Sequence, residues 1–108
     1  MQRNFWIVVF LLLPVVSWAE NYGEVVIVIK NHQFQPDRVH VPAGKKVKLL
    51  IDNQDSTPEE FESYALNREK IIQGGKKGIV YIGSLKAGSY DFMGEFNQAT
   101  AKGTIVAE

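Results

Sequence analysis

The 108-residue sequence has no cysteine. This absence excludes disulfide bonds, which small exported domains often use as staples. It also excludes every metal site that is built on a thiolate. The stability of so short a chain must therefore come from the packing of its secondary structure.

An excess of charge of either sign is also missing. Lys and Arg together number 12, and Asp and Glu together number 12, so we expect no broad basic surface and no nucleic-acid partner. The sequence contains no internal repeat, no low-complexity tract and no periodicity that indicates a long helix. These absences favour a single domain built from strands and turns.

A hydrophobic run long enough to span a membrane is absent as well. The apolar run Phe5–Val16 falls short of the roughly 20 residues that cross a bilayer. Arg3 precedes the run and Ser17-Trp18-Ala19 follows it, which is the pattern of a secretory signal peptide. We predict cleavage after Ala19, leaving residues 20–108 as one domain with no membrane span. The alternative is an uncleaved membrane anchor. Export without disulfides fits a bacterial, periplasmic location.

Short β-branched and alternating runs make up the rest of the chain. They predict an all-β fold, a Greek-key antiparallel β-sandwich of about seven or eight strands, with a helical turn as an option for residues 64–70. The predicted strands are Glu24–Lys30, Arg38–Val41, Val47–Asn53, Ile79–Ile82 and the two strands of the last hairpin, Tyr90–Val106. Six aromatic residues are expected to fill the core, namely Phe34, Phe61, Tyr81, Tyr90, Phe92 and Phe96.

An acidic segment interrupts this strand pattern. It carries three glutamates in four positions, Glu59, Glu60 and Glu62, and like charges this close repel one another unless each gains a partner or stays in water. One interpretation is a solvated acidic loop. The other is a cluster of hard ligands, because carboxylates bind divalent or trivalent cations well once the ion relieves their repulsion.

Two unusual strings give the sequence a family resemblance, Glu59-Glu60-Phe61-Glu62-Ser63 and Gly94-Glu95-Phe96. With Phe34-x-Pro36 and Gly88-x-Tyr90-x-Phe92, they resemble the cupredoxin-like family of bacterial periplasmic proteins found with iron-permease uptake systems. The resemblance implies a cupredoxin sandwich exported to the periplasm, and an inner-membrane iron permease or another periplasmic protein as partner. Membership by itself does not show that metal is bound.

The resemblance also shows which ligands are missing. In the cupredoxin frame of the last hairpin, Gly94 falls where the copper-binding Cys would be, Asn97 where a His would be, and Ala101 or its neighbours where a Met would be. Blue-copper chemistry depends on a Cys thiolate with two His. The resemblance therefore implies a sandwich that lacks the ligands of a blue-copper electron carrier.

Other side chains could replace those ligands. The frame places Glu59 at the position of the first His, with Glu60 as its alternative because a register change of one residue exchanges their faces. Glu95 and Met93 flank the position of the absent Cys, and His32 lies in a loop that the frame brings to the same end. The candidate metal ligands are thus Glu59, Glu60, Glu95, Met93 and His32, and the ion is copper or iron, if any.

Two functions remain open at this point. The first is a periplasmic metal-binding accessory in iron or copper uptake. The second is a metal-free β-sandwich interaction module that contacts a permease or another periplasmic protein. Redox catalysis needs a cycling metal and a substrate pocket, and the sequence indicates neither, so we do not expect an enzyme.

Overall fold

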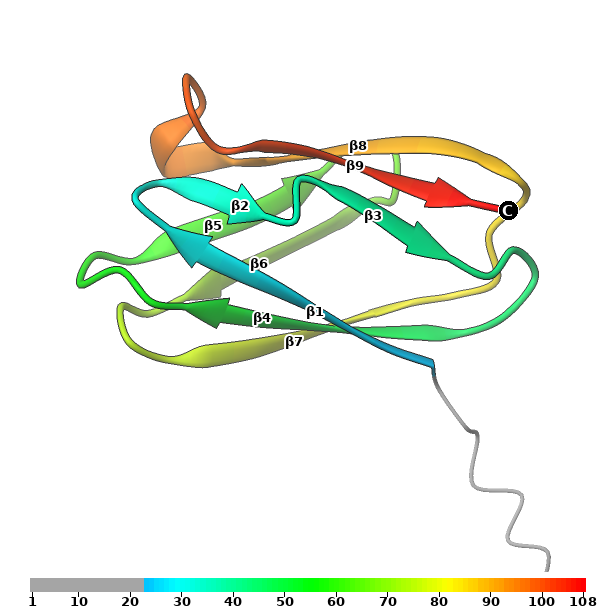
Figure 1. Ribbon diagram of the computed structural model, residues 1–108, viewed down its shortest axis with the longest axis horizontal. Coiled ribbons are helices and arrows are strands. Elements are labelled where there is room, and N and C mark those ends of the chain that lie inside the picture. The colour runs from blue at the N-terminus through cyan, green and yellow to red at the C-terminus, as the bar shows by residue number, and fades with distance from the viewer. Residues whose placement is uncertain (1–22) are drawn as a thin grey trace, which may run out of the picture.

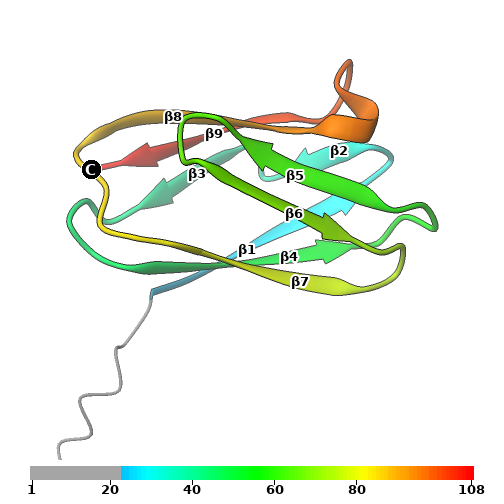
Figure 2. The ribbon, with the colours of Figure 1, turned by 180° about the vertical axis from the view of Figure 1, so that it is seen from behind.

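The computed structural model describes residues 23–108 and shows a sandwich of two β-sheets (Figures 1 and 2). The predicted signal peptide and its cleavage site lie outside the described residues. Within them the structure has nine strands and one short 3-10 helix, η1 (Glu95–Asn97). No helix among these residues is long and apolar enough to cross a bilayer. The β-sandwich fold predicted from the sequence is confirmed.

Four strands form one sheet and five form the other. The four-stranded sheet has the order β2-β1-β4-β7, with β1 (Gly23–Lys30), β2 (Gln33–Gln35), β4 (Val47–Asn53) and β7 (Lys77–Ile82). The five-stranded sheet has the order β3-β9-β8-β5-β6, with β3 (Arg38–Val41), β5 (Glu59–Ser63), β6 (Arg68–Ile72), β8 (Gly88–Gly94) and β9 (Lys102–Ala107).

The pairing of the strands differs from the sequence prediction in two respects. Strand β1 pairs with β4 in parallel, and β3 pairs with β9 in parallel, so both sheets are mixed rather than purely antiparallel. Residues 64–70 were expected to allow a helical turn, but they hold a turn at 64–67, with Asn67 in the left-handed region at φ 53°, and then β6. Strand β6 and the three-residue β2 bring the number of strands to nine.

Aromatic stacking fills the middle of the core. The ring of Phe92 lies 4.9 Å from that of Phe34 and 5.1 Å from that of Phe61, and all three side chains are buried. The sequence prediction was wrong for Tyr81 and Phe96, which are half exposed. Tyr81 alternates with the buried Val80 and Ile82 and therefore faces outward, and Phe96 belongs to η1 rather than to a strand.

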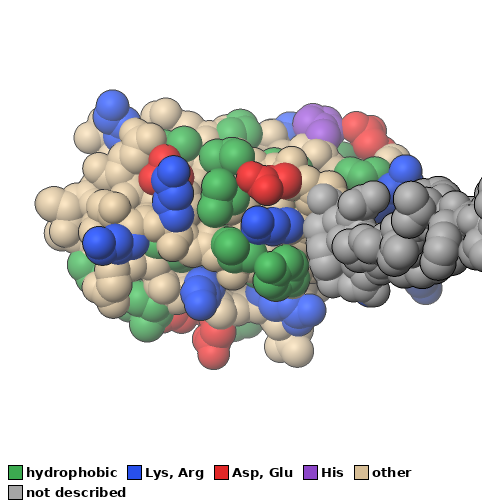
Figure 3. All heavy atoms as spheres, turned by 90° about the horizontal axis from the view of Figure 1, so that it is seen from below, with side chains coloured by type: hydrophobic (Ala, Val, Ile, Leu, Met, Phe, Trp, Pro, Cys, Tyr) green, Lys and Arg blue, Asp and Glu red, His purple; other side chains and the backbone are tan. Residues whose placement is uncertain are grey.

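The outer face of the four-stranded sheet is mixed in character (Figure 3). Hydrophobic side chains gather in the middle of this face, with lysines and acidic residues around them. Val26, Leu50 and Ile79 follow one another across β1, β4 and β7 in a single row. The acidic segment of the sequence lies on the other sheet, on β5.

Candidate metal centre

Glu59 points into the sandwich rather than toward solvent. It is the first residue of β5, alternates with the outward-facing Glu60, and is 1% exposed. Its Oε1 accepts hydrogen bonds from the backbone N–H of Glu60 (3.0 Å) and of Phe96 (2.9 Å), and its Oε2 accepts one from Asn97 Nδ2 (2.7 Å). A buried carboxylate is tolerated only when hydrogen bonds replace its water, and these three donors supply that replacement.

Gly94 is in direct contact with this carboxylate. A Cβ added to Gly94 would lie 2.6 Å from Glu59 Cδ, 2.8 Å from Glu59 Oε2 and 2.6 Å from Ala101 Cβ. The backbone N–H of Gly94 donates to the carbonyl oxygen of Ala101 at 2.9 Å, which closes the loop between β8 and β9. Glu59, Gly94, Asn97 and Ala101 therefore meet at one point at the end of the sandwich.

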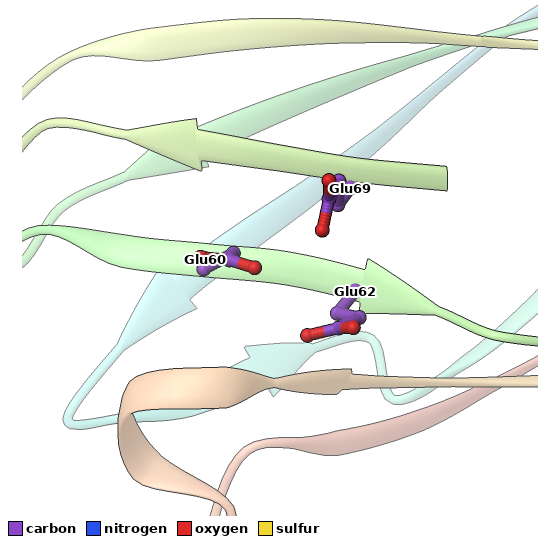
Figure 4. Close-up of side chains that lie close together, drawn as sticks. All are labelled: Glu60, Glu62 and Glu69. Atoms are coloured by element: carbon purple, nitrogen blue, oxygen red, sulfur yellow. The ribbon is translucent and has the colours of Figure 1, made fainter. Parts of the chain in front are cut away.

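Three other glutamates lie close together on the outer face of the five-stranded sheet, and we call them the outer cluster (Figure 4). Glu60 and Glu62 point outward from β5, and Glu69 lies directly opposite Glu62 on β6. Each offers a carboxylate oxygen, and these oxygens lie within 4.8 Å of one another. Strand alternation places Glu60 and Glu62 on one face, and the pairing with β6 brings Glu69 to them.

Glu95 extends this cluster from η1. Its Oε2 is buried and has no hydrogen-bond partner among the described residues. The pKa of Glu95 is raised, first by a hydrogen bond with Glu62, then by desolvation and by the negative charges of Glu62 and Glu60. Two ionised carboxylates are both acceptors, so the bond with Glu62 forms only when a proton is shared. Glu95 Oε2 therefore lacks a partner when both groups are ionised.

The negative charges of this outer cluster act on one another and on a neighbouring tyrosine. The pKa of Glu60 is raised by desolvation and then by the charges of Glu62 and Glu69, and the pKa of Tyr64 is raised chiefly by the charge of Glu62. Three pairs of oppositely charged or chargeable groups within residues 23–108 lie in contact, namely His32 with Asp55, His40 with Glu108 and Lys48 with Glu24. None of these pairs includes Glu60, Glu62 or Glu69, and like charges this close repel one another unless water, protons or a cation compensate them.

Met93 and His32 are placed differently with respect to the cluster. Met93 lies opposite Glu62 in the pairing of β8 with β5, is half-buried and points outward. The His32 ring faces Asp55, 3.5 Å away, and Thr100 Oγ1 donates to the His32 carbonyl oxygen. The structure therefore brings Glu60, Glu95 and Met93 to the outer face, places Glu59 inside, and places His32 beside Asp55.

Comparison with known proteins matches the fold to a family. The family model described as "Cupredoxin-like domain" matches residues 4–107. The chain belongs to the cupredoxin-like domain family. It is 45% identical, over 87 residues, to an uncharacterized protein of Rickettsia prowazekii, a match that covers 81% of this chain and 70% of that protein.

Solved cupredoxins share the fold at low sequence identity. Auracyanin A, a "blue" copper protein of Chloroflexus aurantiacus, superposes with a TM-score of 0.71 and 14% identity over 82% of this chain and all of its own. The metal-binding domain of the Cu(I)-exporting ATPase CopA of Streptococcus pneumoniae superposes with a TM-score of 0.67 and 10% identity over 79% of this chain and 84% of its own. At such identities the likeness establishes the fold alone.

Membership in the cupredoxin-like family allows the group of Glu59, Gly94, Asn97 and Ala101, which we call the interior cluster, to be compared with a blue-copper site. The resemblance of the last hairpin to that of the cupredoxins places Gly94 and Asn97 where blue-copper proteins carry a Cys and a His. In this chain the two residues contact Glu59 instead, and the carboxylate fills the space beside Gly94. A blue-copper site requires a thiolate and two imidazoles as ligands, and this cluster has neither thiolate nor imidazole, so its residues do not fit such a site.

Two residues of the outer cluster were not among the predicted ligands. Glu62 could have been found from the alternation of Glu60 and Glu62 in a strand. Glu69 could not, because its polar neighbours gave no sign of β6 and only that strand brings it to Glu62. A hollow of about 600 Å³ is lined by Met93 and by two residues of each charge, Asp37 and Asp91 with Arg38 and Lys102. We assign no site to that hollow.

Proposed function

We propose that this cupredoxin-like protein is a periplasmic metal-binding accessory in metal uptake, with its ion held by carboxylates on the outer face of the five-stranded sheet. The observation that carries the proposal is the convergence of Glu60, Glu62 and Glu69, whose oxygens lie within 4.8 Å of one another. Glu95 supports it as well, because its Oε2 is buried without a hydrogen-bond partner among residues 23–108. The proposal assigns no catalytic step to the chain.

The donor set favours a hard cation. Carboxylate oxygens suit ions such as iron, manganese or magnesium, whereas Cu(I) prefers thiolate and thioether ligands. Among these ions we propose iron, which agrees with the resemblance to proteins found beside iron permeases. Copper is the alternative ion, supported by the copper-binding proteins among the structural neighbours and by Met93, which stands opposite Glu62.

Calorimetric titration of residues 20–108 tests this function. The ions are Fe(II), Fe(III), Mn(II), Zn(II), Cu(II) and Cu(I), each added to the wild type, to Glu62→Gln and to Glu24→Gln. Glu24 is a control because its carboxylate is on β1 and pairs with Lys48 at 3.6 Å. We expect one ion per chain, no binding to Glu62→Gln, and unchanged binding to Glu24→Gln. Equal affinity in all three proteins would remove the outer cluster from the site.

A metal-free interaction module is the second candidate. The observation in its favour is the interior cluster, in which Glu59 fills the space beside Gly94 and its carboxylate accepts its hydrogen bonds from this chain's own groups. In that case the exposed glutamates would contact a basic surface of a permease or of another periplasmic protein. Failure of every ion to bind the wild type would leave this function in place of the first.

A further inference from the structure

We propose that Glu59 is a positioning residue, whose buried carboxylate fixes the backbone that carries Glu60 and Glu95 and so sets the spacing of the outer carboxylates. The inference rests on the proposed function and deepens it. It assigns to Glu59 a role that does not require contact with the ion. The distinction matters because Glu59 is also the residue that the cupredoxin frame would name as a ligand.

A single oxygen of Glu59 joins the two segments of the cluster. Oε1 accepts one hydrogen bond from the backbone N–H of Glu60 at 3.0 Å and another from the backbone N–H of Phe96 at 2.9 Å. The first N–H belongs to the peptide group that precedes the Cα of Glu60, and the second to the peptide group that follows the Cα of Glu95. Peptide groups are planar and rigid. Holding these two therefore fixes the backbone from which both outward side chains start.

The other oxygen secures the loop. Oε2 accepts Asn97 Nδ2 at 2.7 Å, and the backbone carbonyl of Asn97 accepts the N–H of Ala101 at 2.8 Å. One face of the carboxyl group packs against Gly94, where no Cβ intervenes. The Glu59 side chain is thus confined by hydrogen bonds and by packing, and it is 1% exposed.

The inward-facing side chain of β5 therefore holds the backbone that carries the outward-facing carboxylates. Glu59 faces inward, where its carboxylate accepts hydrogen bonds from three donors of the protein, and Glu60 faces outward beside Glu62. With Glu59 in place, Glu95 lies beside Glu62 on the outer face. Without these bonds, η1 could move away and separate the two carboxylates.

Two substitutions at position 59 distinguish positioning from ligation. In Glu59→Gln the side-chain oxygen still accepts hydrogen bonds from both backbone N–H groups. The Asn97 side-chain amide can rotate so that its oxygen accepts a hydrogen bond from the NH₂ group of the new glutamine. Glu59→Ala removes all three bonds. We expect Glu59→Ala to lower the affinity for the ion that titrates the wild type by about 10- to 100-fold, the range seen when supporting groups around a metal site are removed. We expect Glu59→Gln to stay within about 3-fold of the wild type, because its bonds are preserved.

The outcomes decide the proposal in either direction. Equal losses in Glu59→Gln and Glu59→Ala would show a charged ligand and overturn the positioning role. Unchanged affinity in Glu59→Ala would also overturn it. If Glu59→Ala does not fold, Asn97→Ala removes the Oε2 bond alone, and a several-fold loss of affinity is expected; unchanged affinity would contradict the proposal.

Amide hydrogen exchange tests the same bonds without metal. We expect the Phe96 N–H to be protected in the wild type and in Glu59→Gln, and to exchange at least about 10-fold faster in Glu59→Ala, because a hydrogen-bonded amide exchanges only when its segment opens. Free exchange of the Phe96 N–H in the wild type would overturn the positioning role. If the wild type binds no ion, the proposed function fails, and this exchange experiment still decides whether Glu59 fixes the loop.

Discussion

Replacing Gly94 with alanine tests whether the Glu59 carboxylate fills the position beside the last hairpin. The added Cβ would lie 2.6 Å from Glu59 Cδ and 2.6 Å from Ala101 Cβ. Both distances are shorter than ordinary van der Waals contacts, which begin at 3.4 Å. If the Glu59 side chain moves away from the added methyl group, it loses its hydrogen bonds to Phe96 and Asn97. If it stays, the backbone of β8 or of the loop between β8 and β9 must shift instead.

The size of the effect follows from the cost of overpacking. Inserting a methyl group into a well-packed interior typically costs about 1–3 kcal/mol of unfolding free energy. For a domain of 60 to 100 residues each kcal/mol lowers Tm by about 4–8 °C. We therefore expect Gly94→Ala to melt about 5–20 °C below the wild type.

Thermal unfolding followed by circular dichroism measures this difference. Gly83→Ala is the matched control, because a Cβ at Gly83 meets nothing within 4 Å and its φ is not in the left-handed region. The control should melt close to the wild type. Equal melting temperatures for Gly94→Ala and Gly83→Ala would refute the placement of Glu59 against Gly94.

Three further predictions concern the outer cluster, His32 and the core. A carboxyl whose pKa is higher in the folded than in the unfolded state binds its proton more tightly when folded, so stability rises as pH falls through that pKa. Glu95→Gln should therefore raise Tm of the metal-free protein at pH 7, and should weaken the gain in Tm that the wild type shows as pH falls toward the ordinary value of 4.5; a lower Tm at pH 7 would contradict the repulsion. His32→Ala should leave metal affinity unchanged in the calorimetric titration, because the ring faces Asp55, and a large loss would return His32 to the site. Phe61→Ala should cost about 3–5 kcal/mol in urea unfolding, since it removes one of the three buried rings of the aromatic cluster, and a cost below about 1 kcal/mol would contradict that packing.

The sequence predicted the fold well because strand patterns and turns are local. The alternating run Arg38–Val41 and the β-branched run of β1 both became strands. The parallel pairing of β1 with β4 was missed because sequence alternation carries no information on strand direction. Strand β6 was missed because Arg68-Glu69-Lys70 are polar and exposed, as an edge strand allows.

The candidate site was predictable only in part. Strand alternation required that Glu59 and Glu60 face opposite sides, but it did not fix which of them faces the last hairpin. That choice depends on the pairing of Phe61 with Gly94, a contact between segments far apart in the chain. Glu69 joined the cluster through a similar long-range pairing with Glu62, and no local signal could have indicated it.

The central claim is that the ion binds outside the sandwich and not at the interior position of a blue-copper site. A crystal structure of the protein soaked with Fe(II) or Mn(II), with anomalous diffraction measured at the absorption edge of the metal, tests it directly. We predict one anomalous peak within ligand distance of Glu60, Glu62 and Glu69. A peak between Glu59 and Asn97, or no peak from ions supplied in excess, would contradict the account.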